Sequence, residues 1–217
     1  MTLLTTTFIS PNEERMKEIL HCLEKNCENR EILFIQLMFE NFTPETKPSD
    51  RHTEIISHPK IRIFTTPGRM TFNDWFDFAN RLGERVPREP MIVANSDIYF
   101  DDTIKLLNAD YLEKRFVCLS RRHATLDQVG VPPVDLQAPC AQDAWAFMPP
   151  LRYRPVFDFT TGCRGCDNRI AAEMSLMGYP VSNPCESVHA FHVHASRVTN
   201  YGPAVPGPHM NVNPMRI

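Results

Sequence analysis

An acidic residue follows a short apolar run near the middle of the chain. Met91 to Ala94 are apolar, and Asn95, Ser96 and Asp97 come directly after them. This pattern predicts a buried strand that carries Asp97 at its carboxyl end, the edge of open α/β sheets where ligands bind. A carboxylate there suits a hard divalent cation that holds phosphate. The alternative is that Asp97 only caps the following turn.

Three histidines are close together near the carboxyl end of the chain, at His189, His192 and His194. Residues two apart in a strand share one face, so His192 and His194 are expected to point the same way and His189 the opposite way. Two imidazoles beside a carboxylate form a mixed site that accepts manganese or zinc. The alternative is a structural role in the strand.

The segment from Gly162 to Arg169 contains a third group of chemically capable residues. Cys163 and Cys166 have the spacing of metal ligands, and with the paired histidines they would complete a zinc site of two cysteines and two histidines. The segment fits equally well a loop that enters a helix at Asp167. In that case Asp167 either caps the helix or faces a pocket as a general base.

Further polar residues occur where predicted loops and strands meet. Arg69 precedes a predicted helix, and Arg121 and Arg122 follow a predicted strand. A guanidinium is well shaped for a diphosphate, so each is a candidate contact for one. Each arginine alone fits a surface charge equally well. Asp143 precedes an apolar strand and is expected either to bind a ligand hydroxyl or to cap a turn.

The pattern of apolar residues predicts strands that alternate with helices in the front half of the chain. Strands are expected at residues 3–9, 31–38, 61–64, 91–94, 116–120, 144–148, 179–183 and 187–194, and helices after Ser10, after Thr71, at 101–107 and from Asp167 to Gly178. Residues 41–60 are expected to form a long loop. This alternation favours an α/β fold with a mostly parallel, mixed central sheet flanked by helices.

Two helix starts and one loop are predicted from local signals. Ser10 with Glu13, and Thr71 with Asp74, have the spacing of capping boxes. The loop over residues 121–143 is long enough to be functional rather than only connecting.

The composition is that of an ordinary globular protein, with 217 residues, 42% hydrophobic, 23% charged and a formal net charge of −3. This charge does not favour nucleic-acid binding. The chain has no apolar run of about 18 residues, so no membrane span is expected. Seven cysteines and a start unlike a signal peptide predict reduced thiols in a soluble, cytoplasmic protein. The absence of a phosphate-binding loop, a dinucleotide fingerprint and a nucleophile elbow weakens kinase, dehydrogenase and serine hydrolase interpretations.

The order of these motifs resembles that of GT-A glycosyltransferases over roughly residues 3–200. Asn95-Ser96-Asp97 resembles the Asp-x-Asp motif of that family, with Asn in place of the first Asp. Residues 165–184 look like a second family block, in which an acidic pair opens a helix that ends in Gly-Tyr before a strand, a proline and a metal-binding His. Asp167 falls on the catalytic-base position of inverting members, Cys166 replaces the preceding acid, and His192 or His194 falls near the metal His.

This resemblance implies a GT-A fold, a Rossmann-like nucleotide-diphospho-sugar transferase domain over residues 1–217. About 1–120 would be the nucleotide-sugar-binding half, about 121–200 the acceptor half, and 201–217 a Pro-rich tail that wraps the domain or leads to further domains. It implies a UDP-sugar donor, a glycan acceptor, and Mn²⁺ or Mg²⁺. The residues implied for donor and metal are Thr6, Ser10, Arg69, Asn95, Ser96, Asp97, Arg121, Asp143, His192 and His194. The chain is also similar to the amino-terminal domain of a multidomain glycosyltransferase encoded by chlorella viruses, which implies a viral protein of the host cytoplasm.

Two other functions remain open on the sequence alone. One is a zinc-stabilised binding module that uses Cys163, Cys166, His192 and His194. The other is a metal-dependent nucleotide phosphohydrolase that uses the Asp97 region. Within the transferase interpretation, Asp167 as base predicts inversion, and a retaining mechanism applies if Asp167 does not reach the acceptor.

Overall fold

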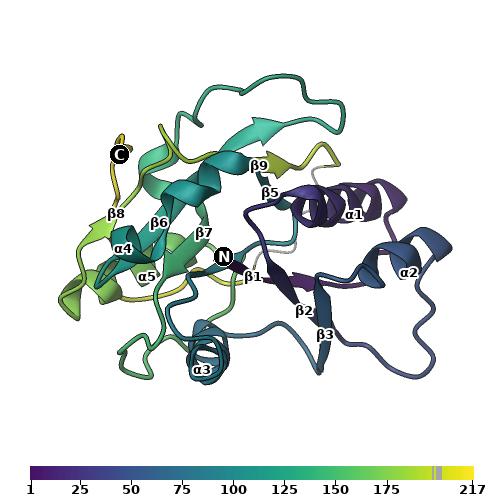
Figure 1. Cartoon of the computed structure of the whole chain (residues 1–217), viewed down its shortest axis with the longest axis horizontal. Coiled ribbons are helices and arrows are strands. Elements are labelled where there is room, and N and C mark those ends of the chain that lie inside the picture. The colour runs from purple at the N-terminus through teal and green to yellow at the C-terminus, as the bar shows by residue number, and fades with distance from the viewer. Residues whose placement is uncertain (197, 199–201) are drawn as a thin grey trace.

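The computed structural model describes residues 1–196, 198 and 202–217. In this part of the chain, nine strands form one mixed sheet with helices packed against it (Figure 1). The strands are β1 (Thr2–Thr7), β2 (Phe34–Glu40), β3 (Ile61–Thr66), β4 (Met91–Ala94), β5 (Ile98–Phe100), β6 (Phe116–Ala124), β7 (Gln142–Phe147), β8 (Val181–Ser182) and β9 (Ala190–Val193). The helices are α1 (Glu13–Glu28), α2 (Asp50–Ile56), α3 (Phe72–Gly83), α4 (Ala109–Leu112) and α5 (Cys166–Leu176), with short 3₁₀ helices η1 (Asp102–Leu106) and η2 (Ala138–Cys140).

The strand order brings the carboxyl ends of most strands to one edge of the sheet. The order is β3-β2-β1-β4-β7-β6-β9-β5, and β8 pairs with β6. The first four strands are parallel, and β7 is antiparallel to both β4 and β6. Strand β9 runs parallel to β6. The carboxyl ends of β1, β2, β4, β6 and β9 therefore lie at the same edge as the amino end of β7. The predicted mostly parallel, mixed α/β sheet is confirmed.

The core consists of apolar side chains on both faces of this sheet. Leu3 and Leu4, adjacent in β1, are fully buried in two different apolar clusters, as the alternation of side chains along a strand requires. The cluster beneath α3 is rich in aromatic rings, and each fully buried ring stabilises the fold by roughly 1.5–3 kcal/mol. The sheet is thus a rigid platform for the groups at its edge.

Two capping predictions have different outcomes. Thr71 and Asp74 form the predicted capping box at the start of α3, with Thr71 N donating to Asp74 Oδ2 (2.8 Å) and Asp74 N donating to Thr71 Oγ1 (3.2 Å). The prediction that Ser10 caps α1 is wrong. Asn12 is the cap, because its Oδ1 accepts from the backbone N of Arg15 at 2.8 Å, and Ser10 Oγ instead accepts from the backbone N of Asn12.

The predicted loop at 41–60 contains a helix that the sequence pattern did not indicate. Helix α2 begins after Ser49, whose Oγ accepts from the backbone N of His52 at 3.2 Å. Only His52 and Ile55 of this helix are buried, so its apolar face is too narrow to give a helical period. The short strand β5 was not predicted either, since three residues carry no period.

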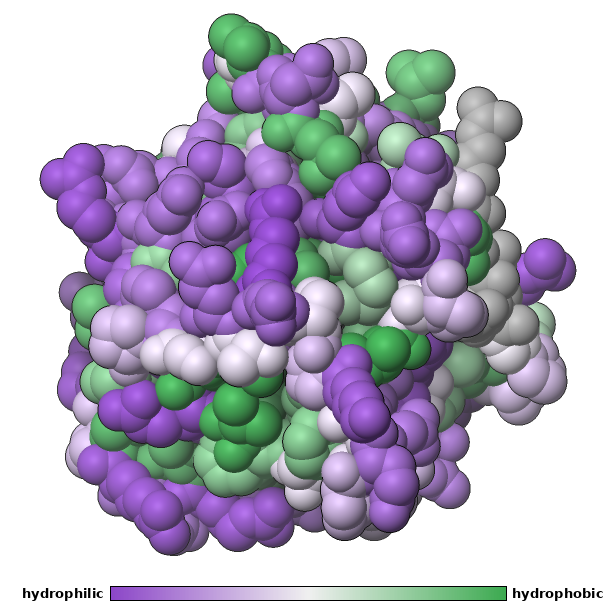
Figure 2. Space-filling model, turned by 90° about the vertical axis from the view of Figure 1, so that its right-hand side faces the viewer, coloured by the Kyte–Doolittle hydropathy of each residue, from purple (hydrophilic) through white to green (hydrophobic). Residues whose placement is uncertain are grey.

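The outer face of the molecule beside α2 and β3 is mainly hydrophilic, with separate apolar patches among the polar side chains (Figure 2). Strand β3 is at one end of the strand order, and its Ile63 and Phe64 are partly exposed. No helix in the described part of the chain combines the length and apolar character that crossing a membrane requires.

The tail after residue 201 packs along the domain. Val205 N donates to Arg164 O, Met210 N to Asn168 O, and Val212 N to Pro139 O, each at 2.8–3.0 Å. Residues 205–210 therefore run beside the start of α5, and Val212 then lies against η2. The predicted boundary between the second half and the tail, at residues 200 and 201, lies outside the described residues.

Candidate functional site

A cavity of about 400 Å³ opens at the sheet edge where the strand ends meet. Arg122 does not line it, and its Nη2 donates to Cys185 O at 2.8 Å instead. The other residues predicted for the donor, the metal and catalysis all line the cavity. They are Thr6, Ser10, Arg69, Asn95, Ser96, Asp97, Arg121, Asp143, Asp167, His192 and His194. The structure brings these residues together because parallel strands place their carboxyl ends at one edge, whereas their individual roles remain predictions.

Asp97, His192 and His194 form a group that could hold a metal ion, with one ligand atom from each within 4.8 Å of the others. Asp97 Oδ2 lies 3.2 Å from His192 Nε2 and 3.5 Å from His194 Nδ1. The register of β5 and β9 pairs Ile98 with His192, which fixes this approach. Within the described residues, the Nε2 atom of His194 is buried and has no hydrogen-bond partner. An anionic carboxylate, two imidazoles and an unsatisfied ring nitrogen fit a divalent transition metal.

The two cysteines do not join this metal group. Cys163 and Cys166 line the same cavity, but in the described residues the group of potential ligands contains neither. The thiol of Cys163 lies 3.1 Å from Thr160 Oγ1 instead, and Cys166 is buried at the start of α5. The geometry therefore gives no support to the zinc site of two cysteines and two histidines.

A buried arginine that the sequence did not indicate completes the surroundings of Asp97. Arg15 Nη2 lies 2.7 Å from Asp97 Oδ2, and Arg15 Nη1 lies 3.0 Å from Glu18 Oε2. Glu18, only 2% exposed, also accepts from the backbone N of Ser196 at 2.6 Å and from its hydroxyl at 2.9 Å. Helix α1 thus fixes the Asp97 carboxylate and ties it to the chain just after His194.

These contacts determine the charge of Asp97. Burial by itself would raise the pKa of this carboxyl group, but His192, His194 and Arg15 outweigh burial and hold the pKa well below its usual range. Burial would likewise lower the pKa of His192, and the neighbouring Asp97 raises it instead. Asp97 is therefore a permanent carboxylate beside Arg15 and two imidazoles.

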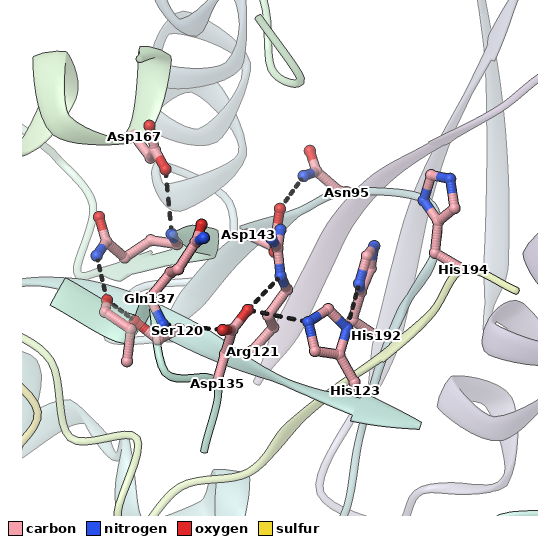
Figure 3. A network of polar contacts seen from close by, with 12 residues as sticks. Asn95, Ser120, Arg121, His123, Asp135, Gln137, Asp143, Asp167, His192 and His194 are labelled. Carbon is pink, nitrogen blue, oxygen red and sulfur yellow. Dashed lines mark hydrogen bonds and ion pairs between the residues drawn. The ribbon is translucent and has the colours of Figure 1, made fainter. Parts of the chain in front are cut away.

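A chain of polar contacts runs from Asn95 to His192, both of which line the cavity (Figure 3). Asn95 Nδ2 donates to Asp143 Oδ1 at 2.7 Å, and Arg121 Nη1 donates to Asp143 Oδ2 at 2.8 Å. Arg121 also pairs with Asp135, which contacts His123 at 3.0 Å, and the Nδ1 atoms of His123 and His192 are 3.5 Å apart.

This network gives Arg121 protein partners, although a contact with a diphosphate was predicted for its guanidinium. Burial would lower the pKa of Arg121, but Asp143 and Asp135 raise it well above its usual value. The guanidinium is therefore already neutralised by two carboxylates. Arg69 is less constrained, with its Nη1 3.4 Å from Thr161 O and its Nε 3.9 Å from Glu40 Oε1.

Asp167 lies in the first turn of α5 on the opposite side of the cavity from His194 (Figure 3). The helix follows Gly165, whose φ of 75° is in the left-handed region that favours glycine. Asp167 Oδ2 accepts from the backbone N of Gln142 at 3.3 Å, and its Oδ1 accepts from that of Asn168 at 3.0 Å. Burial, together with the charge of Asp143, raises the pKa of Asp167 to about 6, although these N–H groups lower it. A carboxylate with this pKa is suited to accept a proton near neutral pH.

Glu40 is a further cavity-lining residue that the sequence did not indicate. It ends β2, is buried, and lines a second cavity of about 290 Å³ together with Phe8, Ile9, Asn41, Thr46 and Arg69. Burial raises the pKa of Glu40, and Arg69 partly counteracts this. The signal was an acid at the end of a buried strand, as at Asp97, but the strand was expected to end at Met38.

Solved structures identify the fold. One is the mannosyltransferase PcManGT from Pyrobaculum calidifontis in complex with GDP-Man and Mn²⁺, with a TM-score of 0.53 and 16% identity over 89% of this chain and 56% of that chain. Another is GalNAc-T7 with UDP, GalNAc and Mn²⁺, with a TM-score of 0.54 and 11% identity over 94% of this chain and 44% of that chain. The chain thus has the GT-A fold and spans about half the length of these proteins. No protein-family model and no curated protein sequence matches it.

Proposed function

We propose that this chain is a metal-dependent glycosyltransferase that moves a sugar from a UDP-sugar to a hydroxyl group of a glycan acceptor. The observation that carries the proposal is the shared cavity of Asp97, His192, His194 and Asp167 at the functional edge of a GT-A sheet. Fold alone does not assign function, and these groups supply the chemistry. In this proposal, residues from about 1 to 120 bind the donor, and about 121 to 200 bind the acceptor.

The two adjoining cavities fit the parts of a nucleotide sugar. The base would occupy the cavity beside Phe8, Ile9 and Glu40, next to the predicted Thr6–Ser10 segment. Arg69 lines both cavities, so its guanidinium is placed for the diphosphate that joins the base end to the sugar end. The sugar would then lie near Asn95, Ser96 and Asp143.

Asp97, His192 and His194 would hold the metal ion. Mg²⁺ prefers oxygen ligands, so the two imidazoles favour Mn²⁺ over Mg²⁺. When bound, the ion supplies Lewis-acid neutralisation of the charge that develops on the departing diphosphate. Arg15 keeps Asp97 in one position and in its anionic form.

Asp167 would act as the general base. Its carboxylate takes the proton of the acceptor hydroxyl while the acceptor oxygen bonds to the anomeric carbon of the sugar. The bond between that carbon and the diphosphate oxygen breaks, and UDP leaves with the bonding electrons. Because attack and departure occur on opposite faces of the sugar, the product has inverted anomeric configuration.

The test is calorimetric titration of the protein with a panel of UDP-sugars and GDP-mannose, first with Mn²⁺ and then with EDTA. We expect Mn²⁺-dependent binding of at least one UDP-sugar, followed by slow release of UDP in water and faster release with an acceptor glycan. Failure of every panel member to bind in Mn²⁺ would overturn the proposal. Release of nucleoside monophosphate and sugar phosphate would instead identify a phosphohydrolase.

A further inference from the structure

Asn95 and Asp143 are held opposite each other by the pairing of two adjacent strands. Ala94 of β4 pairs with Ala144 of β7, and the backbone N of Asn95 donates to Asp143 O at 3.0 Å just beyond that pair. The side chains meet as well, at 2.7 Å between Asn95 Nδ2 and Asp143 Oδ1 (Figure 3). Sheet register, rather than loop flexibility, sets this contact.

The chemical types of the two side chains matter because they are so close. A carboxylate at position 95 would place two like charges opposite each other across adjacent strands, which is destabilising. The amide instead donates a hydrogen bond, so the pair carries a single negative charge, and that charge belongs to Asp143. Arg121 binds the other oxygen of the same carboxylate at 2.8 Å.

The carboxylate of Asp143 retains the capacity to bind a ligand. An ionised carboxylate has about four acceptor positions, and the two contacts from Asn95 and Arg121 use one on each oxygen. The remaining positions suit two neighbouring hydroxyl groups. Asp143, Asn95 and Arg121 all line the cavity that also contains Asp97.

We infer that Asp143 is the anionic group that binds a vicinal diol of the donor, and that Asn95 and Arg121 are the positioning residues that aim its two oxygens. This inference rests on the proposed transferase function. It has an unexpected consequence. Replacing Asn95 by Asp would complete the Asp-x-Asp pattern, and yet it would weaken donor binding, because the new carboxylate would displace that of Asp143.

The experiment compares the wild type with Asn95→Asp, Asp143→Asn and the double variant. Each protein is titrated in Mn²⁺ with UDP and with UDP-glucose. If the wild type does not bind UDP-glucose, the UDP-sugar that the wild type does bind is used instead. We expect each single variant to lose about tenfold or more in affinity, as a lost buried charged contact does. The double variant restores one amide and one carboxylate across the same pair, so it should bind more tightly than either single variant. Asn108→Asp is the control, because it adds the same charge at an exposed helix cap where Asp serves as well as Asn.

The two ligands distinguish which diol is bound. Equal losses for UDP and the UDP-sugar would place Asp143 on the ribose, and a loss for the UDP-sugar alone would place it on the sugar. If Asn95→Asp or Asp143→Asn binds both ligands like the wild type, or if the double variant shows only the summed losses, the inference is wrong. If Asn95→Asp does not fold, Asn95→Ala takes its place and should also weaken binding. A wild type that binds no panel member would contradict the proposed function itself.

Discussion

Two carboxylates line one cavity and differ in almost every contact: Asp97 is buried, and Asp167 is half-buried. Asp97 is surrounded by Arg15, His192 and His194, and these groups hold its pKa well below the usual range. Asp167 has two backbone N–H groups and the charge of Asp143 nearby, and burial raises its pKa to about 6. Such a separation of pKa values within one site assigns different chemical roles to groups of the same type. The comparison supports the roles proposed above, in which Asp97 is a permanent anion that holds a cation and Asp167 is the proton acceptor.

The largest expected effect comes from removing the permanent anion. Asp97→Asn should abolish Mn²⁺-dependent binding of the donor, since it leaves two imidazoles and no negative charge in the metal group. Calorimetric titration with Mn²⁺ and with EDTA measures this. The control is Asp102→Asn, which removes an exposed carboxylate at the start of η1, outside the cavity. Unchanged metal-dependent binding in Asp97→Asn would remove Asp97 from the site.

The next effect concerns the proton acceptor. Asp167→Asn should leave donor binding intact and slow transfer by about 10²–10⁴-fold, the usual contribution of a general base. Donor titration and single-turnover measurement of transfer separate the two. The control variant is Asp110→Asn, which changes an exposed carboxylate that does not line the cavity. Transfer at the wild-type rate would contradict the role of Asp167, and a retained anomeric configuration in the wild-type product would contradict the inverting mechanism.

The third prediction concerns how much Arg15, the cationic neighbour of Asp97, contributes to the stability of the fold. Arg15→Met leaves the buried carboxylates of Asp97 and Glu18 without their shared partner, which should cost about 3–5 kcal/mol of the free energy of unfolding. The matched control is Arg51→Met, which breaks the exposed ion pair with Glu24 and should cost no more than about 1 kcal/mol. Urea denaturation measures both, and similar losses would show that the buried pair has no special importance.

The sequence predicts some residues of this cavity and misses others, and the difference lies in whether a local pattern marks them. Asp97 and Arg121 were found because apolar runs end abruptly at both. Asp97 does follow the end of β4, but the predicted strand end before Arg121 is wrong, because β6 continues to Ala124 and pairs Arg121 with Ala190 of β9. Arg15 and Glu18 were missed because charged residues in a helix are normally solvated, and only the packing of α1 on β5 and β9 buries them. The contact between Asn95 and Asp143 depends on strand register, which no local pattern encodes. Glu40 was missed because β2 continues two residues past its predicted end.

The smallest effect is a pH-dependent gain in stability when Asp167 loses its charge. A carboxyl group whose pKa is raised on folding stabilises the native state at low pH, and this contribution is lost as the pH rises through the folded pKa. For Asp167 the change runs from the ordinary value of 3.8 to about 6. At pH 7–8, Asp167→Asn should therefore have a free energy of unfolding up to about 3 kcal/mol larger than that of the wild type, since one pKa unit is worth about 1.4 kcal/mol. Thermal denaturation measures this as a higher unfolding temperature. At pH 4 the difference should shrink, because Asp167 is then protonated in the native state. A gain of equal size at both pH values would mean that the charge of Asp167 is not the cause, and the contrast with Asp97 would lose its electrostatic basis.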